Sequence, residues 1–336
     1  MDFTAQTEAL SHWRCTPRHI EPLPGSALNE RWRVEPDGGG EVVILRRCSP
    51  ASVPAGAQFE HEVLWHMWTA GWPVAPPLPA QDGCDVITTG SGRWSLFAFL
   101  PGAPAPADDS LFLQRKGAVL ALVQRDLATW EAPGARPGFG RVTDLHAPLR
   151  RHGFEDFADL ATWWEEFDPG RAAAIRAVRA RNLQALELRG YGGLPDVTVY
   201  GGCFGDNVLF EGKDVTGLLA FDSTHRDVRV ADPALSLLAD CGVDADRVAR
   251  WLGGYATFSE PALSREEADM LPDLMLANAI RNTVVLLSGS ARSGPEWMRE
   301  SAIHDVDILL PRLETSLGAL RRITQAAAGF TRTQTD

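Results

Sequence analysis

The sequence has very little lysine and no cysteine pattern typical of a metal site. Lys116 and Lys213 are the only lysines among 32 basic residues. The five cysteines are scattered without a CxxC pair, which excludes a disulfide frame and zinc-type spacing and favours reduced thiols. Because arginine presents a planar fork rather than a compact ammonium group, it does not simply replace lysine at a site that needs one.

Targeting signals and a basic surface are also missing. The N-terminal segment lacks a basic stretch followed by an apolar one, so no signal peptide is expected. No run reaches the roughly 18 apolar residues of a membrane span. The formal net charge of −12 argues against nonspecific nucleic-acid binding. We therefore expect a cytoplasmic protein of 336 residues, long enough for two lobes, with neither nucleic acid nor membrane as a partner.

The first hundred residues are predicted to be rich in strands. A glycine cluster at 36–40 between residues 20–34 and the apolar run 41–47 predicts a hairpin. Apolar spacing predicts a helix over 58–67. Two further strands, at 84–89 and 94–100, are separated by a Gly-Ser-Gly turn. A linker composition at 101–106 then marks the end of an N-lobe at 1–100.

Helical patterns dominate the predicted C-lobe, 101–336. They cover residues 111–130, about 157–188, 231–240, 264–288 and 296–322. Short runs separated by glycine turns predict three strands at 197–200, 207–210 and 216–221. No GxSxG element or long Rossmann glycine motif occurs, so hydrolase and dehydrogenase functions have no support.

The segment VYGGCFGDNVLFEGKDVTGLLAFD at 199–222 resembles the catalytic stretch of the aminoglycoside phosphotransferase and homoserine kinase-like (choline kinase-like) family. In that family the stretch runs His-Gly-Asp, four residues, Asn, two strands and Asp-Phe-Asp. The resemblance covers nearly the whole chain, including a hinge at 97–102 and a structural acidic motif at 230–235. It implies an α+β, two-lobed protein-kinase-like fold with a small strand-rich N-lobe and a mainly helical C-lobe.

The same resemblance implies that key catalytic side chains are missing from a degenerate loop at 199–222. Gly202 stands at the place of the general base, Ala220 at that of the main metal ligand, and Tyr200 at that of the motif histidine. Asn207 keeps the position of an Asn metal ligand. Loss of a metal's charge stabilisation removes several kcal/mol from the transition state, and loss of a general base costs a factor of about 100 to 10000. Ordinary phosphoryl transfer is therefore not expected.

Two carboxylates remain as substitutes. Asp222 would share the face of Ala220, about 6–7 Å further along, if the strand continued that far. Asp206 adjoins Asn207. With Tyr200, these two residues are the candidate catalytic substitutes, and Asp222 is a candidate metal ligand beside Asn207. Natural loss and an engineered inactive variant both remain open.

For the nucleotide, the resemblance implies a phosphate grip at Arg46, where the family has a lysine. Arg47 is the alternative if the register slips by one, and Glu62 on the following helix is the expected ion-pair partner. An arginine can hold phosphate bidentately. A surface Arg–Glu pair is the alternative interpretation.

Gly25 and Ser26 resemble the loop over the phosphates, with a plain turn as the alternative. The hinge around Phe97 and Phe99 would meet an adenine edge, with core packing as the alternative for both side chains. The cofactors that the resemblance implies are ATP and Mg²⁺, and the two missing carboxylates weaken that implication.

A ligand pocket is predicted where the family builds its acceptor site. Trp163, Trp164 and Glu165 combine aromatic walls with a carboxylate, which suits a cationic or sugar-like ligand. The alternative places one indole in the core and the acid in solvent. His225 and Arg226 are candidate contacts for an anionic ligand, with a solvated loop as the alternative.

Three functions follow as hypotheses. The first is a pseudokinase that binds a nucleotide, a small metabolite or a partner protein without ordinary phosphoryl transfer. The second is a biosynthetic enzyme that uses the same cleft for another reaction. The third is a weak ATP-dependent phosphotransferase that relies on Asp206 and Asp222. The sequence predicts no oligomeric state.

Overall fold

A computed structural model describes residues 2–26, 29–49, 54–106, 109–291 and 294–330, without the side chains of residues 24–26. The chain divides into two compact units. Unit 1 comprises Met1–Ala103, Ala132–Gly138 and Leu209–Asp222, and unit 2 comprises Pro104–Glu131, Phe139–Val208 and Ser223–Asp336. The predicted lobes, 1–100 and 101–336, are continuous in sequence, and their boundary stays a prediction.

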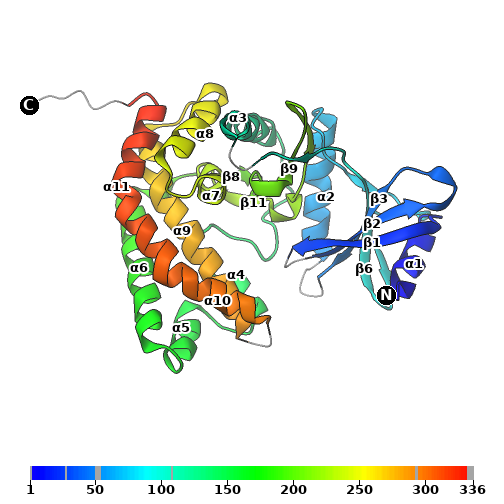
Figure 1. Cartoon of the computed structure of the whole chain (residues 1–336), viewed down its shortest axis with the longest axis horizontal. Helices are drawn as coiled ribbons and strands as arrows, with labels where there is room; N and C mark the ends of the chain where they lie inside the picture. Colours follow the sequence, from blue (N-terminus) through cyan, green and yellow to red (C-terminus); the bar gives the residue numbers. More distant parts are fainter. Residues whose placement is uncertain (1, 27–28, 50–53, 107–108, 292–293, 331–336) are drawn as a thin grey trace, which may run out of the picture. The chain divides into compact units, whose positions relative to one another are not determined.

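Unit 1 is built on an antiparallel sheet of order β1-β2-β3-β6-β4, with β5 paired to β6. Its strands are β1 (Pro17–Ser26), β2 (Asn29–Pro36), β3 (Val43–Cys48), β4 (Pro77–Leu78), β5 (Ile87–Thr89) and β6 (Gly92–Ala98). Strands β1, β2, β3 and β6 of this sheet are labelled in Figure 1. The β2–β3 turn contains Gly38 and Gly39, whose φ angles of 76° and 81° suit glycine. The hairpin predicted from the glycine cluster is therefore confirmed, as is the strand pair around residues 90–91.

Two helices accompany the sheet of unit 1. Helix α1 (Thr4–Ser11) places Ala9 and Leu10 in a hydrophobic core with Trp32 and Trp94 of the sheet. Helix α2 (Pro54–Thr69) contains the helix predicted over 58–67. Its buried face includes Phe59, so the apolar spacing in this segment identified the helix correctly.

A second hairpin of unit 1 leads to Ala220, the residue that the resemblance puts at the position of the main metal ligand. The hairpin consists of β9 (Val208–Glu211) and β10 (Asp214–Leu218). The two-residue strand β7 (Ala103–Pro104) comes much earlier in the chain. The prediction that the strand runs to residue 221 is wrong, because Ala220 has φ 62° and Phe221–Ser223 forms a 3-10 turn. Asp222 therefore does not share a strand face with Ala220.

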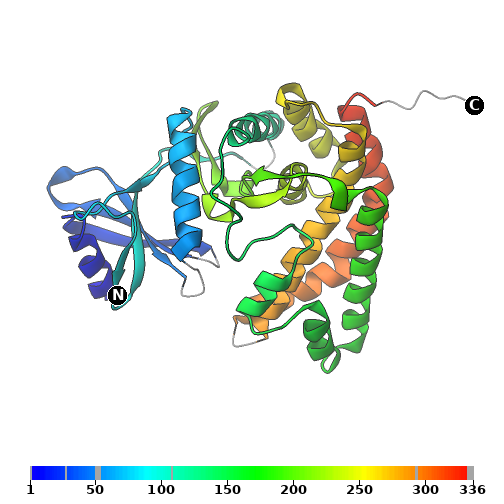
Figure 2. The same cartoon turned by 180° about the vertical axis from the view of Figure 1, so that it is seen from behind.

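Unit 2 is mainly helical. Its helices are α3 (Ser110–Leu127), α4 (His146–Arg151), α5 (Phe157–Glu165), α6 (Pro169–Leu188), α7 (Ala231–Asp240), α8 (Ala245–Phe258), α9 (Arg265–Ser290), α10 (Glu296–His304) and α11 (Leu310–Ala327). Helix α9 packs against both α6 and α11, which can be followed by their colours in Figure 2. The mixture of an antiparallel sheet with a helical second part confirms the predicted α+β class.

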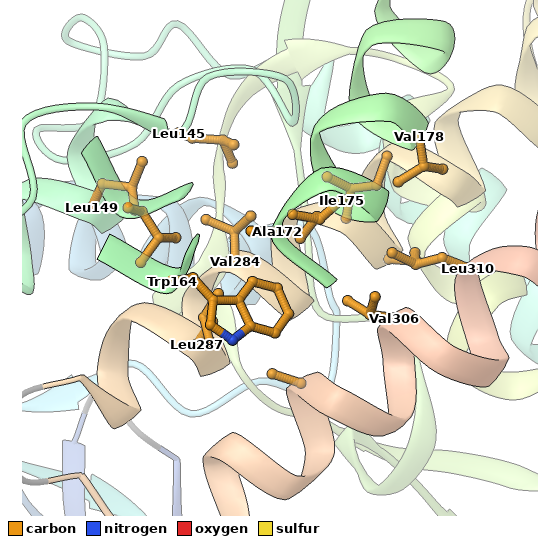
Figure 3. Packing of buried hydrophobic residues seen from close by; sticks show 14 of the residues in the cluster. Leu145, Leu149, Trp164, Ala172, Ile175, Val178, Val284, Leu287, Val306 and Leu310 are labelled. Carbon is orange, nitrogen blue, oxygen red and sulfur yellow. The ribbon is translucent and has the colours of Figure 1, made fainter. Parts of the chain in front are cut away.

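Two predicted helices are each divided in the structure. The run 157–188 breaks into α5 and α6 because Asp168 caps α6 and Pro169 starts it. The run 296–322 becomes α10 and α11, joined by a π-helical turn at Asp305–Leu309. Leu145, Trp164, Ile175, Val284 and Leu310, from this part of unit 2, pack into one core (Figure 3).

Helix α8 was not predicted, and its packing against α3 depends on one glycine from each helix. A Cβ atom on Gly117 of α3 would lie 2.1 Å from the carbonyl oxygen of Trp251 in α8. A Cβ atom on Gly254 of α8 would lie 1.8 Å from the carbonyl oxygen of Gln114 in α3. Glycine costs a helix about 1 kcal/mol relative to alanine. Here it permits close backbone contact between the two helices.

Helix α9 is long and apolar enough to cross a membrane by length and composition, a test applied to the described residues. Within its most apolar window, 78% is buried inside the structure. Core helices pass the same test, and α9 begins with a capping box between Ser264 and Glu267. Its burial identifies it as the central helix of unit 2.

Candidate functional site

A buried carboxylate in unit 2 holds the loop that follows β8 (Asp196–Val199). Asp232 accepts hydrogen bonds from the backbone N–H groups of Tyr200 and Gly201, each at 2.8 Å. Burial raises the pKa of Asp232, and these two donors oppose that rise. Gly201 has φ 70°, and a Cβ atom there would lie 2.7 Å from the Ser223 carbonyl oxygen. This position therefore requires glycine.

The other end of the loop is held by an ion pair. Lys116 Nζ lies 3.0 Å from Asp240 Oδ1 and donates to the carbonyl oxygen of Gly205 at 3.1 Å. The N–H of Gly205 donates to the same carboxylate oxygen at 2.8 Å. Both side chains are buried, so these hydrogen bonds help to offset the cost of removing two charges from water. One of the two lysines of the chain thus supports the loop.

The loop itself offers little chemistry between these supports. Gly202 is buried and carries no side chain. Tyr200 is fully buried, which suits packing better than contact with a substrate. Asp206 is exposed, and Asn207 is half-buried at the end of a short 3-10 turn. The loop keeps a defined backbone without a carboxylate at the position of the general base.

A cavity of about 290 Å³ lies beside this loop in unit 2. Its lining includes Gly201, Phe204, His225, Asp227 and Arg281. His225, on β11 (His225–Val228), has its Nε2 3.9 Å from Asp227 Oδ2. The cavity therefore combines an apolar wall with groups of both charges.

A pocket of about 300 Å³ lies within unit 1. Its walls are mostly apolar and come from β3, α2, β6 and the β9–β10 hairpin; they include Ile44, Leu64, Phe97, Phe99, Leu209 and Leu218. Its charged lining residues are Arg31, Arg46 and Glu60. Apolar walls with a few convergent polar groups are typical of small-molecule sites.

Arg46 forms a buried, bidentate ion pair at the wall of this pocket. Its Nη1 and Nη2 donate to the two carboxylate oxygens of Glu60 at 2.5 and 3.1 Å. The guanidinium lies 4.5 Å from the centre of the Phe97 ring. Burial, followed by the charges of Arg46 and Arg136, lowers the pKa of His61 to about 3, so this histidine is neutral near pH 7.

Further polar groups extend this cluster. Arg136 Nη1 donates to the Phe221 carbonyl oxygen at 3.1 Å, and its Nη2 lies 3.8 Å from Glu60 Oε2. Asp222 accepts a hydrogen bond from Asn29 Nδ2 at 2.9 Å. Burial, followed by the charge of Glu60, raises the pKa of Asp222. The carboxyl group of Asp222 is therefore hydrogen-bonded to the first residue of β2.

These residues do not fit the metal that the family resemblance implies. The main ligand position holds Ala220, which has no oxygen in its side chain. Among the described residues, no group of three or more His, Cys, Asp or Glu side chains is placed to hold a metal ion. Asn207 belongs to unit 2 and Asp222 to unit 1, and their joint role as ligands stays a prediction.

Residues 19–268, more than half of the chain, match the phosphotransferase enzyme family (APH). The chain belongs to this family. The homoserine kinase of Mesorhizobium japonicum is 28% identical over 262 residues, covering 75% of each protein. The homoserine kinase of Caulobacter vibrioides is 25% identical over 312 residues, covering 88% of this chain and 92% of that protein.

Two solved structures show the same fold. A microcompartment-associated aminopropanol kinase matches with a TM-score of 0.75 and 19% identity over 95% of this chain and 99% of its own. An amicoumacin kinase in complex with AMP-PNP, Ca²⁺ and Ami matches with a TM-score of 0.70 and 14% identity, over 93% of each chain. These similarities confirm the predicted phosphotransferase family and kinase-like fold.

The structure corrects the predicted partner of Arg46. Glu60, rather than Glu62, forms the ion pair, and Glu62 accepts a hydrogen bond from Gln58 instead. Residues two positions apart in sequence lie about 200° apart around a helix, so only one of these two glutamates can face β3. Arg47 faces away from the pocket and pairs with Glu30 at 2.5 Å, which makes the alternative register wrong.

The two hinge phenylalanines both line the unit 1 pocket, although Phe97 is buried and Phe99 is 42% exposed. Gly25 and Ser26 lie at the end of β1, and their side chains are outside the described part of the structure. The predicted phosphate loop therefore stays a prediction.

The predicted aromatic pocket in unit 2 has a different role. Trp164 is only 4% exposed and packs in the hydrophobic core of Figure 3, so it does not form a pocket wall. Trp163 packs against the same core, and Glu165 forms an exposed ion pair with Arg176 at 2.7 Å. His225 lines the cavity beside the loop, whereas Arg226 donates to the Asp196 carbonyl oxygen.

Sequence reasoning missed several residues of these sites. Arg31 was detectable, since it stands in β2 opposite Arg46 in the predicted hairpin. Glu60 was an alternative to Glu62 on the same predicted helix. Arg136 lies in an irregular segment with no periodic pattern, and its contact with Glu60 depends on the fold. No local signal identifies it.

Proposed function

We propose that this member of the phosphotransferase family binds a nucleotide, through its heterocyclic ring, in the unit 1 pocket and does not carry out ordinary phosphoryl transfer. The observation that carries the proposal is a contrast within unit 1. The apolar pocket beside Arg46 is formed, while Ala220 offers no metal ligand. Gly202 in unit 2 supplies no general base. Catalysis of phosphoryl transfer depends mainly on positioning and electrostatic stabilisation. The side chains at positions 202 and 220 can supply neither a general base nor a metal ligand for it.

The size and the lining of the pocket are suited to binding the planar heterocyclic ring of a nucleotide. A volume of about 300 Å³ lies at the small end of ligand sites, and Phe97 and Phe99 offer aromatic surfaces. Relatives of this chain include proteins named as kinases, and one structurally similar protein was solved in complex with the ATP analogue AMP-PNP. Adenosine is therefore the appropriate first probe.

The proposal is tested by titrating adenosine into the protein by calorimetry. Ala75 lines the pocket and its replacement Ala75→Phe would fill it, whereas Ala70 is exposed at the end of α2. We expect measurable binding to the native chain and to Ala70→Phe, and at least a tenfold loss for Ala75→Phe. No binding of adenosine, or binding that Ala75→Phe leaves unchanged, would overturn the proposal.

A weak phosphotransferase is the second candidate, because Asp222 lies among charged groups of the same cluster. Its carboxyl group is engaged by Asn29, and burial favours its protonated form, which makes it a poor metal ligand as it stands. This candidate predicts ATP turnover that Asp222→Asn abolishes. A biosynthetic reaction of another kind remains the third hypothesis and has no specific observation in its favour.

A further inference from the structure

We propose that a cavity of unit 2, separate from the one beside the loop, binds a small apolar amine. The cavity has a volume of about 490 Å³ and lies between α3, β8, the end of β11 and the segment 259–267, which leads from α8 into α9. Among the described residues, it shares no lining residue with the cavity beside the loop or with the unit 1 pocket. The inference therefore does not depend on the proposed function.

The wall of this cavity is mostly apolar. It includes Ala121 of α3, Val197 of β8, Val228 of β11 and, from the connecting segments, Leu194 and Pro261. The volume falls within the range of small-molecule sites, which are typically lined by apolar groups with a few polar ones. Contact with such a wall removes apolar ligand surface from water, which favours binding. The body of the ligand is therefore expected to be apolar.

Arg229 is the cation of the lining, and its donors are already engaged. A guanidinium has five N–H groups. Nε and Nη2 of Arg229 donate to the two carboxylate oxygens of Glu267. The other three hydrogen bonds go to the Ser259 hydroxyl and to the carbonyl oxygens of Pro261 and Ala262. An anionic ligand would have to displace one of these acceptors.

Other polar groups of the wall are engaged as well. Gln124 Nε2 donates to the Arg229 carbonyl oxygen at 3.0 Å, and its Oε1 accepts from the Tyr255 hydroxyl at 2.6 Å. Glu267 also accepts from the N–H of Ser264 at 2.9 Å. These hydrogen bonds fix the wall before a ligand arrives, which lowers the ordering cost of binding.

Two polar side chains of the lining remain available to a ligand. Thr198 is only 6% exposed, and its hydroxyl forms no hydrogen bond with the other described residues. Buried hydroxyl groups are normally satisfied. Glu260 is exposed, and its carboxylate forms no hydrogen bond or ion pair with the described side chains. Arg125, on which the charge of Glu260 acts, is itself hydrogen-bonded to Asp126.

These two side chains define the polar part of the ligand. Because Arg229 and Glu267 neutralise each other, the open charge in the lining is the carboxylate of Glu260. That carboxylate attracts a cation and repels an anion. The Thr198 hydroxyl can both donate and accept a hydrogen bond. An apolar amine that also carries a hydroxyl group therefore matches the cavity.

The test compares three probes that share an aromatic body and differ in charge: tyramine, its neutral analogue tyrosol and its anionic analogue 4-hydroxyphenylacetate. Each is titrated into the full chain, and binding is followed by the amide shifts of the ¹⁵N-labelled protein. We expect saturable binding of tyramine, about threefold tighter than that of tyrosol and about tenfold tighter than that of 4-hydroxyphenylacetate. Phenethylamine, which lacks the hydroxyl group, should bind about fivefold more weakly than tyramine.

Two variants assign the polar contacts. Glu260→Gln should remove the preference for tyramine over tyrosol, and Glu131→Gln, at an exposed position outside the lining, is its control. Thr198→Val should weaken tyramine binding about fivefold and leave phenethylamine binding unchanged. Thr257→Val, at an exposed position of α8, is the matched control. Since Glu260 is exposed, its variant tests the site even if Thr198→Val does not fold.

Several results would overturn the proposal. These are no saturable binding of tyramine, equal binding of the three probes, or tighter binding of either analogue. A preference for tyramine that Glu260→Gln leaves intact would also overturn it, because the amine would then bind elsewhere. Each of these results leaves the proposed function in place, since adenosine binding is assigned to the unit 1 pocket and is measured separately.

Discussion

The loop of unit 2 and the charged cluster of unit 1 differ in what supports them. In the loop, buried side chains outside the catalytic motif fix the backbone: Asp232 holds one end, and Lys116 with Asp240 holds the other. In unit 1, the charged residues mainly hold one another, as Arg46 and Glu60 do. The backbone of the loop is therefore held independently of the side chain that stands at position 202.

This difference also explains why the two altered positions are not equivalent. Gly202 stands in a loop whose supports are complete. Ala220 stands in the left-handed region with φ 62°, a conformation that costs a residue other than glycine roughly 1–3 kcal/mol. Unit 1 therefore carries local strain at Ala220, where the family resemblance implies a metal-binding carboxylate.

The largest expected effect concerns the support of the loop. Asp232→Ala would leave the N–H groups of Tyr200 and Gly201 buried without their acceptor. At about 1–3 kcal/mol for each unsatisfied group, we expect a loss of about 4 kcal/mol in the free energy of unfolding. Urea denaturation measures it. Asp206→Ala, at an exposed position of the same loop, is the control and should change stability by less than about 0.5 kcal/mol.

The second-largest expected effect is a difference in stability between variants of the two glutamates of α2, Glu60 and Glu62. Glu60→Gln leaves Arg46 buried without its anionic partner, and we expect a loss of about 3 kcal/mol in the free energy of unfolding. Glu62→Gln changes a residue that accepts a hydrogen bond from Gln58 at an exposed pair and should have an effect below about 0.5 kcal/mol. Equal effects of the two variants in chemical denaturation would contradict the ion pair described above.

The third effect is a pH dependence that originates at His61. Its pKa is lowered from 6.5 to about 3 in the folded protein, so the unfolded chain takes up a proton first as the pH falls. Its contribution to stability is complete above pH 6.5 and decreases toward pH 3, by about 2 kcal/mol at pH 5.

Chemical denaturation of the native chain and of His61→Gln between pH 7 and pH 5 measures this difference. The comparison with the variant is necessary because Asp222, whose pKa is raised, acts in the opposite direction as the pH falls. Parallel pH profiles for the two proteins would show that His61 is not held in its neutral form.

The smallest effect tests the backbone strain at Ala220. Ala220→Gly should raise the free energy of unfolding by about 1 kcal/mol, because glycine adopts a φ of 62° without strain. Ala98→Gly, in a strand of the same unit, is the control and should lower it by about 0.5–1 kcal/mol. A destabilising Ala220→Gly would show that the left-handed backbone is not strained.

Much of the fold was predictable because its signals are local. Glycine turns identified the β2–β3 hairpin, and apolar spacing identified α2, α3, α7 and α9. The strand predicted to reach residue 221 was too long, because an alanine with positive φ gives no sign in the sequence. Helix α8 was missed, and the contact of its Gly254 with α3 depends on distant residues.

The candidate sites were less predictable because they depend on contacts between distant segments. The family resemblance found Arg46 and the altered loop, but helix phase decided between Glu60 and Glu62. Arg136 meets Glu60 only through the fold, and Trp164 was assigned to a pocket although it belongs to the core. A sequence motif shows where candidate functional residues lie along the chain, whereas burial in the folded structure determines which of their side chains can contact a ligand.

ATP turnover by the native chain tests the central claim most directly. Radiolabelled ATP is incubated with the protein, with Mg²⁺ and a panel of hydroxyl and amine compounds, under conditions where adenosine binding has been measured. We expect no release or transfer of the γ-phosphate above the level without protein. Turnover that depends on the protein and is abolished by Asp222→Asn would contradict it.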